Sequence, residues 1–485
     1  MVFSSTIFLF YFLPLTILLY FLSPYSWKNY VLLLASIFFF AWGAPVFIFI
    51  LLASVSVDFY LGNRIYSQTE KPKRKNFLIL SIVLNLGMLA YFKYANFFLE
   101  NINVVFGAIG INAIHWTKII LPIGISFFTF QKMSYIFDIY RGGKEPLKKL
   151  SDFALYILLF PQLIAGPIVR YSEIADQLLD RRAMLTLDNK LRGIQRFIIG
   201  LAKKMLIANA MGEQVDAAFS GGIQSLGTIS AWIVMMAYAL QIYFDFSGYS
   251  DMAIGIGRIL GFKIPENFKN PYISKSIIEF WKRWHISLTN WFRDYLFYPL
   301  AFATSRKLYK EKYIGLKTDY WIYLIAAFVT FFLTGFWHGA SWNFVIWGAY
   351  HGVWLILDRF FLKKVLKRIG AFPATLFSFV IVIFGWVLFR VESLQDIALY
   401  MNKMLIPAGG SLQLSNHFWL IFILGLIVVF IPAFFRNEVK LQQWYEENKR
   451  VSLLVLKNVV IVFLLILSMS EIVSTGFNPF IYFRF

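Results

Sequence analysis

The stretch "FWLIFILGLIVVFIPAFF", residues 418 to 435, decides the fold class of this chain. It carries no charged residue and is apolar on every face, so neither a helix nor a strand built from it has a side suited to water. A transmembrane β-barrel would need segments of about ten residues that alternate strictly between apolar and polar. This run is instead about as long as a helix that crosses ~30 Å of hydrocarbon. It therefore predicts a membrane-spanning helix.

The rest of the chain repeats this signal. Of its 485 residues, 59% are hydrophobic, 20% aromatic and only 15% charged, which excludes a soluble globular protein. The first apolar run begins at residue 3 with no basic leader or cleavage site, so we expect it to be retained. The predicted spans, some of which we expect to be half-spans, are 3–23, 30–43, 45–62, 77–92, 119–137, 153–169, 227–247, 320–336, 342–357, 374–390, 417–434 and 453–472. Residues 30–62, interrupted by "WGAP", form either one kinked helix or two short ones.

A formal charge of +20 is compatible with nucleic-acid binding, but Lys and Arg of a multispan protein normally collect in cytoplasmic loops. We therefore predict no nucleic-acid partner. The basic segments predicted to be cytoplasmic are 71–75, 141–149, 306–317, 359–368 and 436–450. The charge-poor segments 93–118 and 391–416 are predicted to be exterior loops. We find no repeat and no soluble insert, so one integral membrane domain is predicted over residues 1–485.

Residues 170–226 and 248–318 mix aromatics with many charges and are predicted to be interfacial. In residues 276–300, five large apolar side chains recur every three or four positions between Lys, Arg and Asp, which indicates amphipathic helices at the cytoplasmic face. A further stretch, "FPQLIAGPIVRYSEI" (160–174), is broken at Pro161 and again at Gly166–Pro167 before Arg170. This pattern fits a re-entrant segment or a kinked ordinary span.

The chain has no cysteine, which excludes disulfides, thiolate metal sites and an acyl-cysteine intermediate on this chain. Asp245 and Asp251 lie six residues apart and do not share a helix face, so we predict no metal site there. We expect them instead to orient a histidine, to pair with Arg258 or to cap a helix. The residues left for chemistry near neutral pH are the five histidines His115, His285, His338, His351 and His417.

His338 has the most unusual surroundings, in "LTGFWHGASWNFVIWGAYHG" (333–352). Residues 318–358 lie between two basic segments and so predict a hairpin with His338 near its bend. With about 16 residues in each arm, a helix rises only ~24 Å and falls short of a full crossing. Gly335 and Gly339 let the backbone leave the helix there, which membrane depth tolerates only beside protein or a water-filled cavity.

The histidines 338, 351 and 285 differ in their surroundings, and His338 and His285 each allow two interpretations. His338 is either a neutral general base in a cavity or a core histidine bonded to a carbonyl. His351, on a regular helix, is interpreted as a packing residue. His285, within "FWKRWHISL" (280–288), belongs either to an interfacial aromatic belt or to a site that receives an anionic donor such as a nucleotide or phosphopantetheine.

Four long motifs in order give the chain a family resemblance. "FPQLIAGPIVR" (160–170), "FDFSGYSDMAIGIGRILGF" (244–262), "EFWKRWHISLTNWFRDYLFYPL" (279–300) and "FWHGASWNFVIWGAYHG" (336–352) resemble the membrane-bound O-acyltransferase superfamily. The bacterial branch is most similar, with the membrane subunits of alginate O-acetylation, peptidoglycan O-acetylation and teichoic acid D-alanylation. "LPIGISFFTFQKMSYIFDIYRG" (121–142) and the terminal "NPFIYFRF" extend the likeness along the chain.

The resemblance implies an all-α, multi-pass helical bundle in which short interfacial and re-entrant helices surround a central funnel. It also implies that His338 is the catalytic residue and His285 the second important one. Such a funnel brings a cytoplasmic thioester and an exterior hydroxyl together, so that His338 removes the hydroxyl proton during attack. A covalent intermediate on Ser341, on the same helical turn, is the weaker alternative. The residues expected to bind substrates are Trp284, Trp337, Asn343, Asp245, Arg170 and Arg293.

The function implied is transfer of an acetyl group from a cytoplasmic thioester, acetyl-CoA, towards hydroxyls of an exported cell-wall or exopolysaccharide polymer. An extracytoplasmic acyltransferase or esterase-like partner would complete delivery, and membrane lipids surround the chain in a bacterial cytoplasmic (inner) membrane. No bound cofactor is expected. D-alanyl transfer from an acyl carrier protein to teichoic acid is the first alternative. A proton-coupled transporter or flippase is the second, but it predicts inverted repeats that the sequence lacks.

Overall fold

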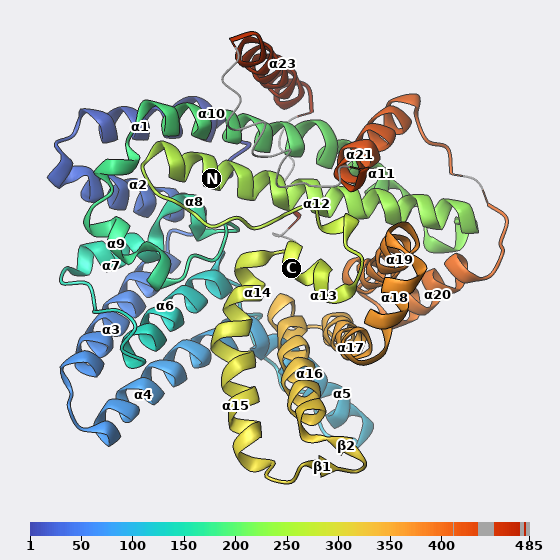
Figure 1. Ribbon diagram of the computed structural model, residues 1–485, viewed down its shortest axis with the longest axis horizontal. Helices are drawn as coiled ribbons and strands as arrows, with labels where there is room; N and C mark the ends of the chain where they lie inside the picture. Colours follow the sequence, from blue (N-terminus) through green and yellow to red (C-terminus); the bar gives the residue numbers. More distant parts are fainter. Residues whose placement is uncertain (411, 435–450, 476–479, 482–485) are drawn as a thin grey trace. The chain divides into compact units, whose positions relative to one another are not determined.

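The chain is almost entirely helical, as its apolar runs predict. The computed structural model describes residues 1–410, 412–434, 451–475 and 480–481 (Figure 1). Among these, seven helical segments are long and apolar enough to cross a membrane: Phe47–Ser67, Lys71–Ala108, Thr228–Ile259, Thr318–His338, Ala371–Arg390, Asn416–Ala433 and Ser452–Ser474. The prediction of an all-α, multi-pass membrane protein is confirmed. The basic segment 436–450 lies outside the described residues, and of the terminal "NPFIYFRF" only Phe480 and Ile481 lie within them.

The chain divides into two compact units. The first contains Met1–Ile194 and Ala253–Pro265, and the second contains Gln195–Met252 and Glu266–Phe485. Helices α10 (Leu187–Ala202) and α12 (Thr228–Ile259) contribute residues to both. The other elements of the first unit are η1 (Phe8–Phe12), α1 (Leu13–Leu22), η2 (Tyr25–Trp27), α2 (Lys28–Gly43), α3 (Phe47–Ser67), α4 (Lys71–Leu89), η3 (Ala90–Tyr94), α5 (Ala95–Ala108), α6 (Ile125–Tyr140), α7 (Leu150–Leu158), α8 (Phe160–Leu163), α9 (Tyr171–Leu179) and η4 (Arg182–Met184).

A buried ion pair holds three helices of the first unit together. Lys132 of α6 lies 3.4 Å from a carboxylate oxygen of Asp58 on α3, and both side chains are at most 2% exposed. Ser81 and Asn85 of α4 donate hydrogen bonds of 2.6 and 2.9 Å to the same carboxylate. Buried charges are tolerated when they are paired and hydrogen-bonded in this way.

Several boundaries in the first unit differ from the predicted ones. Residues 30–62 form two helices, α2 and α3, which Pro45 separates. Segment 93–118 was predicted to be a loop, but the helix continues through η3 and α5 to Ala108, because that charge-poor stretch lacks a helix breaker until Gly107. Helix α6 begins only at Ile125, after Gly124 has turned the chain at a φ of 77°.

The stretch around Pro161 is broken, as its sequence indicates. Helix α7 ends at Leu158, the single turn α8 contains Pro161, and residues 167–170 are not helical, although residues 153–169 are all buried. A Cβ atom on Gly166 would lie 2.6 Å from the Cα of Gln162, so only glycine allows this close return of the backbone. The segment is therefore no continuous span.

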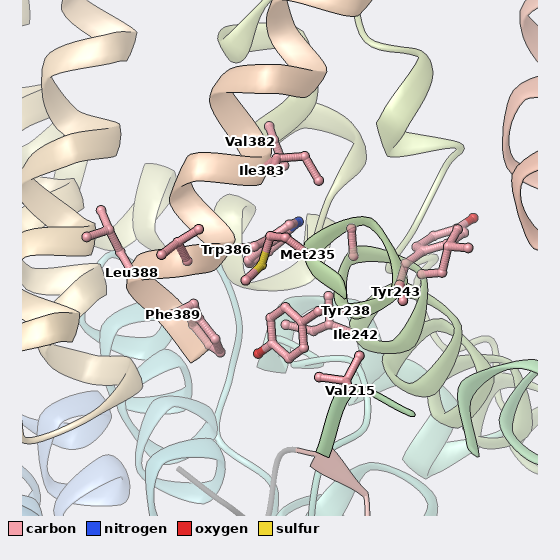
Figure 2. Packing of buried hydrophobic residues seen from close by; sticks show 14 of the residues in the cluster. Val215, Met235, Tyr238, Ile242, Tyr243, Val382, Ile383, Trp386, Leu388 and Phe389 are labelled. Atoms are coloured by element: carbon pink, nitrogen blue, oxygen red, sulfur yellow. The ribbon is translucent and has the colours of Figure 1, made fainter. Parts of the chain in front are cut away.

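The second unit holds the histidine motifs. Its elements are η5 (Lys203–Ala208), α11 (Asn209–Ser220), η6 (Ile223–Ser225), η7 (Pro271–Ile273), α13 (Ile277–Arg283), α14 (Ile286–Phe292), η8 (Arg293–Phe297), α15 (Tyr298–Lys307), β1 (Lys312–Tyr313), β2 (Leu316–Lys317), α16 (Thr318–His338), α17 (Trp342–Leu357), η9 (Asp358–Leu362), α18 (Lys363–Ile369), α19 (Ala371–Arg390), α20 (Leu394–Leu405), α21 (Asn416–Phe434) and α23 (Val451–Thr475), together with its part of α12. Its core gathers side chains of α12 and α19, among them Met235, Tyr238, Trp386 and Phe389 (Figure 2).

The predicted hairpin with His338 at its bend is present. Helix α16 ends at His338, residues 339–341 are not helical, and α17 starts at Trp342. The predicted arm length is wrong for α16, which has 21 residues and is long enough to cross a membrane. The helix begins at polar Thr318, before the apolar run, and continues past the predicted end to His338. Helix α17, with 16 residues, has the predicted short length.

The amphipathic stretch 276–300 is also present, but it is not one helix. Its periodic apolar residues Phe280, Trp284, Leu288, Trp291 and Tyr295 are all buried, whereas the cations between them are more exposed. The helix breaks at His285, and a new helix starts at Ile286. Two other expectations were wrong: residues 248–259 continue α12, and 391–416 contains the helix α20.

Candidate functional site

His338 is the last residue of helix α16, and aromatic side chains surround it. Its side chain is 8% exposed. The imidazole lies 5.1 Å from the ring of Trp347 on α17 and 5.4 Å from Phe389 on α19, both edge-on. Trp337, its sequence neighbour, is buried and lies 5.0 Å from the same imidazole. Helix termination, the glycine that follows and three aromatic neighbours therefore fix this histidine at one place.

The backbone around His285 is as unusual as the helix end at His338. His285 caps α14 with a φ of 44°, a left-handed conformation that is uncommon for residues other than glycine. Its Nδ1 lies 3.1 Å from Oδ1 of buried Asn267. The backbone N–H and the hydroxyl of Ser287 also donate to this oxygen, at 3.2 and 2.8 Å, so this atom of Asn267 is the acceptor. His285 must then carry its proton on Nδ1, which leaves a lone pair on Nε2.

Burial also sets the charge of His285. It lowers the pKa of the imidazole to about 3, from an ordinary value of 6.5. A folded-state pKa below the unfolded one means that the unfolded chain binds the proton more tightly. The free energy of unfolding therefore keeps the full benefit of a neutral His285 above about pH 6.5. It loses this benefit as the pH falls towards 3 and the unfolded chain becomes protonated at this residue.

This shift predicts a difference between the unaltered chain and His285→Gln. Between pH 7 and pH 5 the unaltered chain should lose about 2 kcal/mol more of its free energy of unfolding than the variant. Thermal unfolding midpoints in detergent at the two pH values measure this. Equal pH slopes for both proteins would contradict the assignment of a buried, neutral imidazole.

Aromatic rings connect the surroundings of the two histidines. Trp284, which precedes His285, lies 4.8 Å from Trp386 of α19, and Trp386 lies 5.7 Å from Phe389, the neighbour of His338. Edge-on and tilted ring pairs of this kind each add about 0.5–1.5 kcal/mol beyond burial. The network therefore holds α13, α19 and the end of α16 in one rigid arrangement.

His351 lies in the same region as a packing residue, as predicted. Its ring is 1% exposed and lies 5.0 Å from Trp281 and 4.9 Å from Trp347. A Cβ atom on Gly385 of α19 would come within 2.6 Å of its Nε2, so the glycine makes room for the imidazole. His115 and His417 are exposed and far along the chain from these motifs.

A cavity of about 470 Å³ lies among α13, α14, η8, α16 and α17. Its wall is mainly apolar and aromatic, with the charged groups Lys282 and Arg293, both exposed, and the polar groups Thr289, Asn290, Thr330 and Thr334. On α16 the lining residues Tyr323, Ala327, Thr330 and Thr334 recur every three or four positions, on one face. The next position of that face is His338, one helical turn beyond Thr334.

Two residues after the bend have structural contacts. The Asn343 side-chain amide donates a 3.3 Å hydrogen bond to the carbonyl of Leu388, which ties the start of α17 to α19. Ser341 donates its hydroxyl to Asn343. Because the helix ends at His338, Ser341 does not share a helical turn with it, contrary to the expectation behind a covalent intermediate.

The other predicted substrate-binding residues lie in different places. Arg293 lines the cavity and pairs with Asp294 at 2.7 Å. Asp245 is buried, pairs with Lys204 at 2.6 Å and accepts a 2.6 Å hydrogen bond from the backbone N–H of Ile481. Arg170 belongs to the first unit, where it pairs with Glu173 at 2.6 Å.

Pairing with Arg258, one of three roles expected for the α12 carboxylates, was wrong. Asp251 is bound by Arg196 and Lys203, each at 2.6 Å. These two cations belong to the part of α10 and η5 that packs in the second unit. Charge pattern within one helix could not indicate partners that lie fifty residues away.

Sequence reasoning missed several residues of the site. Thr330 and Thr334 had a usable signal, because they are hydroxyl residues two turns and one turn before His338, respectively, in a mainly apolar helix. Trp281 had a weaker one, four positions before His285. Asn267 had none, since its importance depends on a contact between residues 18 positions apart.

Comparison with known proteins agrees with these motifs. The model of the membrane-bound O-acyltransferase family matches residues 10–391. The probable alginate O-acetylase AlgI of Azotobacter vinelandii is 42% identical over 418 residues, which cover 84% of this chain and 79% of that protein. The peptidoglycan O-acetyltransferase of Helicobacter pylori is 34% identical over 443 residues (84% and 80%), and the teichoic acid D-alanyltransferase of Streptococcus thermophilus is 31% identical over 253 residues (50% and 58%). The chain therefore belongs to the membrane-bound O-acyltransferase family and is a multi-pass membrane acyltransferase.

Proposed function

We propose that the chain moves an acetyl group from a cytoplasmic thioester, acetyl-CoA, across the membrane towards hydroxyls of an exported cell-wall or exopolysaccharide polymer. The observation that carries the proposal is the cavity of about 470 Å³ whose α16 face continues to His338. Relatives named for alginate and for peptidoglycan O-acetylation support the acetyl group and a polysaccharide acceptor. An extracytoplasmic acyltransferase or esterase-like partner would complete delivery.

The chemistry of the cavity wall suits a coenzyme A thioester. The exposed cations Lys282 and Arg293 can receive phosphates, while the aromatic and aliphatic wall can bury the flexible pantetheine arm. Buried Trp281 also lines the cavity, and its indole N–H has no hydrogen-bond partner among the described residues. This donor group can therefore bind a carbonyl of the arm.

The reaction needs a base for the acceptor hydroxyl and a residue that orients the acyl donor. A hydroxyl of the acceptor loses its proton to His338 as its oxygen bonds to the thioester carbonyl carbon. The C–S bond then breaks, and the proton passes from His338 to the departing thiolate, so that ester and thiol are the products. His285, neutral and protonated on Nδ1, would orient the donor by accepting at Nε2 a hydrogen bond from an amide N–H of the pantetheine arm.

The donor can be identified with purified protein in lipid nanodiscs. Incubation with labelled acetyl-CoA and a soluble polysaccharide acceptor should give a labelled, base-labile ester, whereas D-alanine bound to a carrier protein should give none. Label transfer from the carrier alone would replace this proposal with D-alanyl transfer. Transport of the acceptor without ester formation would favour a flippase.

Filling the cavity tests the path of the donor. Thr334→Phe places a ring in the cavity next to His338, and we expect kcat/KM for acetyl-CoA to fall at least about tenfold, mainly through KM. The matched control is Leu333→Phe, because Leu333 neighbours Thr334 on α16 but is 38% exposed and does not line the cavity. Equal kinetics for both variants would show that the donor does not use this cavity.

A further inference from the structure

The turn of the β1–β2 hairpin carries a residue that its geometry disfavours. β1 and β2 pair antiparallel with Tyr313 opposite Leu316, so Ile314 and Gly315 form a two-residue loop. Both have positive φ, 47° and 75°, which such turns usually meet with Asn-Gly. A β-branched residue is strained there. Ile314 is also 90% exposed, so no packing against the described residues compensates for either cost.

Hydrogen bonds hold the β1–β2 hairpin in place, so the exposure of Ile314 is a property of an ordered loop. Tyr313 turns inward, where its hydroxyl accepts hydrogen bonds from the backbone N–H groups of Tyr309 and Lys310 at 3.0 and 3.2 Å. The indole of Trp321 on α16 donates a 2.8 Å hydrogen bond to the carbonyl of Tyr313. Tyr309, in contrast, is 85% exposed. A fixed loop thus presents two large apolar side chains outwards.

Cations surround this apolar tip. The exposed basic residues from the last turn of α15 to the start of α16 are Arg306, Lys307, Lys310, Lys312 and Lys317, against one acidic residue, Glu311. None of the five is in a salt bridge within the described part of the chain. Apolar side chains ringed by Lys and Arg are the composition of segments that lie in the interface of an anionic bilayer.

The position of the hairpin in the second unit agrees with a membrane surface. It directly precedes Thr318, the first residue of α16, which is long and apolar enough to span (Figure 1). The ring of Phe360 on η9 lies 4.4 Å from the ring of Tyr320 in the first turn of α16, tilted by 40°, and the exposed Arg359 precedes Phe360. Helix α18 follows with four more exposed cations and leads into α19, another candidate span. The starts of two spans thus adjoin basic segments.

We propose that the loop 309–317 is a lipid-binding anchor: Ile314 and Tyr309 enter the interfacial region of the leaflet, and the surrounding lysines bind anionic headgroups. The proposal is independent of the reaction proposed above. Each lysine near an anionic surface strengthens such binding about fivefold. Replacing Lys310, Lys312 and Lys317 with glutamine should therefore weaken insertion of the loop on the order of 100-fold.

Because the chain has no cysteine, a single introduced cysteine can carry a nitroxide spin label. Ile314→Cys is labelled in nanodiscs of phosphatidylcholine with and without phosphatidylglycerol, and collision with oxygen is compared with collision with a water-soluble nickel chelate. Val428→Cys on α21, 52% exposed, serves as the hydrocarbon reference. Gln395→Cys on α20, also exposed, serves as the water reference.

We expect the label at 314 to resemble the hydrocarbon reference in anionic nanodiscs and to approach the water reference when the three lysines are replaced. Ile314→Asn restores a favoured Asn-Gly turn, so it should keep or raise the thermal midpoint in detergent while a label at Tyr309→Cys becomes water-accessible. A label at 314 that matches the water reference in both lipid compositions overturns the proposal. Protection that requires an added acidic carrier protein also overturns it, because the loop would then be a protein-docking surface.

Discussion

His338→Ala is expected to lower the rate of acetyl transfer about 10²- to 10⁴-fold, the usual contribution of a positioned general base. The imidazole ends α16 at the continuation of the cavity face, and no other histidine shares that position. Alanine would leave the acceptor hydroxyl without a group that takes its proton. The measurement is ester formation from labelled acetyl-CoA by purified protein in nanodiscs, at saturating donor.

A companion variant separates chemistry from packing. His338→Gln keeps most of the side-chain volume among Trp337, Trp347 and Phe389 but supplies no basic nitrogen. It should be as inactive as alanine while its thermal midpoint stays near that of the unaltered chain. His351→Gln is the matched control, since His351 contacts Trp347 as well and has no proposed role in the reaction. Transfer by folded His338→Ala within about tenfold of the unaltered chain would refute the assignment.

Much of the fold could be predicted because lipid exposure makes the hydrophobic signal strong. The hairpin with His338 at its bend followed from two basic segments and two glycines. Helix ends were less certain. The charge-poor stretch that forms α5 resembles a loop when only charge is considered, and polar Thr318 and Asp319 conceal the first two residues of α16. Charge indicates which side of a membrane a segment favours, whereas hydrogen bonding of the backbone decides where a helix stops.

The site could be predicted only where its residues lie within one motif. His338, Trp337 and His285 stand in recognisable local patterns. The break at His285 was not predictable from periodicity, because the apolar spacing continues unchanged through it, and the left-handed backbone is fixed by Asn267 from another segment. The partners of Asp245 and Asp251 are likewise cations on other elements. Contacts between distant segments leave no trace in one sequence.

The second large effect is expected at the crossing of α16 and α17, where two glycines bring the backbones together. A Cβ atom on Gly335 would lie 2.3 Å from the carbonyl oxygen of Phe344 and 2.8 Å from the Cα of Gly348. No side chain rotation relieves a contact with backbone atoms, so Gly335→Ala must push the helices apart by about 1 Å. Overpacking of this kind costs about 1–3 kcal/mol of the free energy of unfolding.

The displacement acts on the reaction as well, because Gly335 lies one turn before His338 on the same helix. A misplacement of about 1 Å can cost about 100-fold in rate, so Gly335→Ala should lose most transfer activity even where it remains folded. Gly352→Ala is the matched control on α17. Its Cβ would lie 3.3 Å from the ring of Phe328 and at least 3.5 Å from every other neighbouring atom, so it needs little displacement. Kinetics and thermal midpoints of both variants test this. If Gly335→Ala were as active and stable as Gly352→Ala, the close approach of the two helices would not be what positions His338.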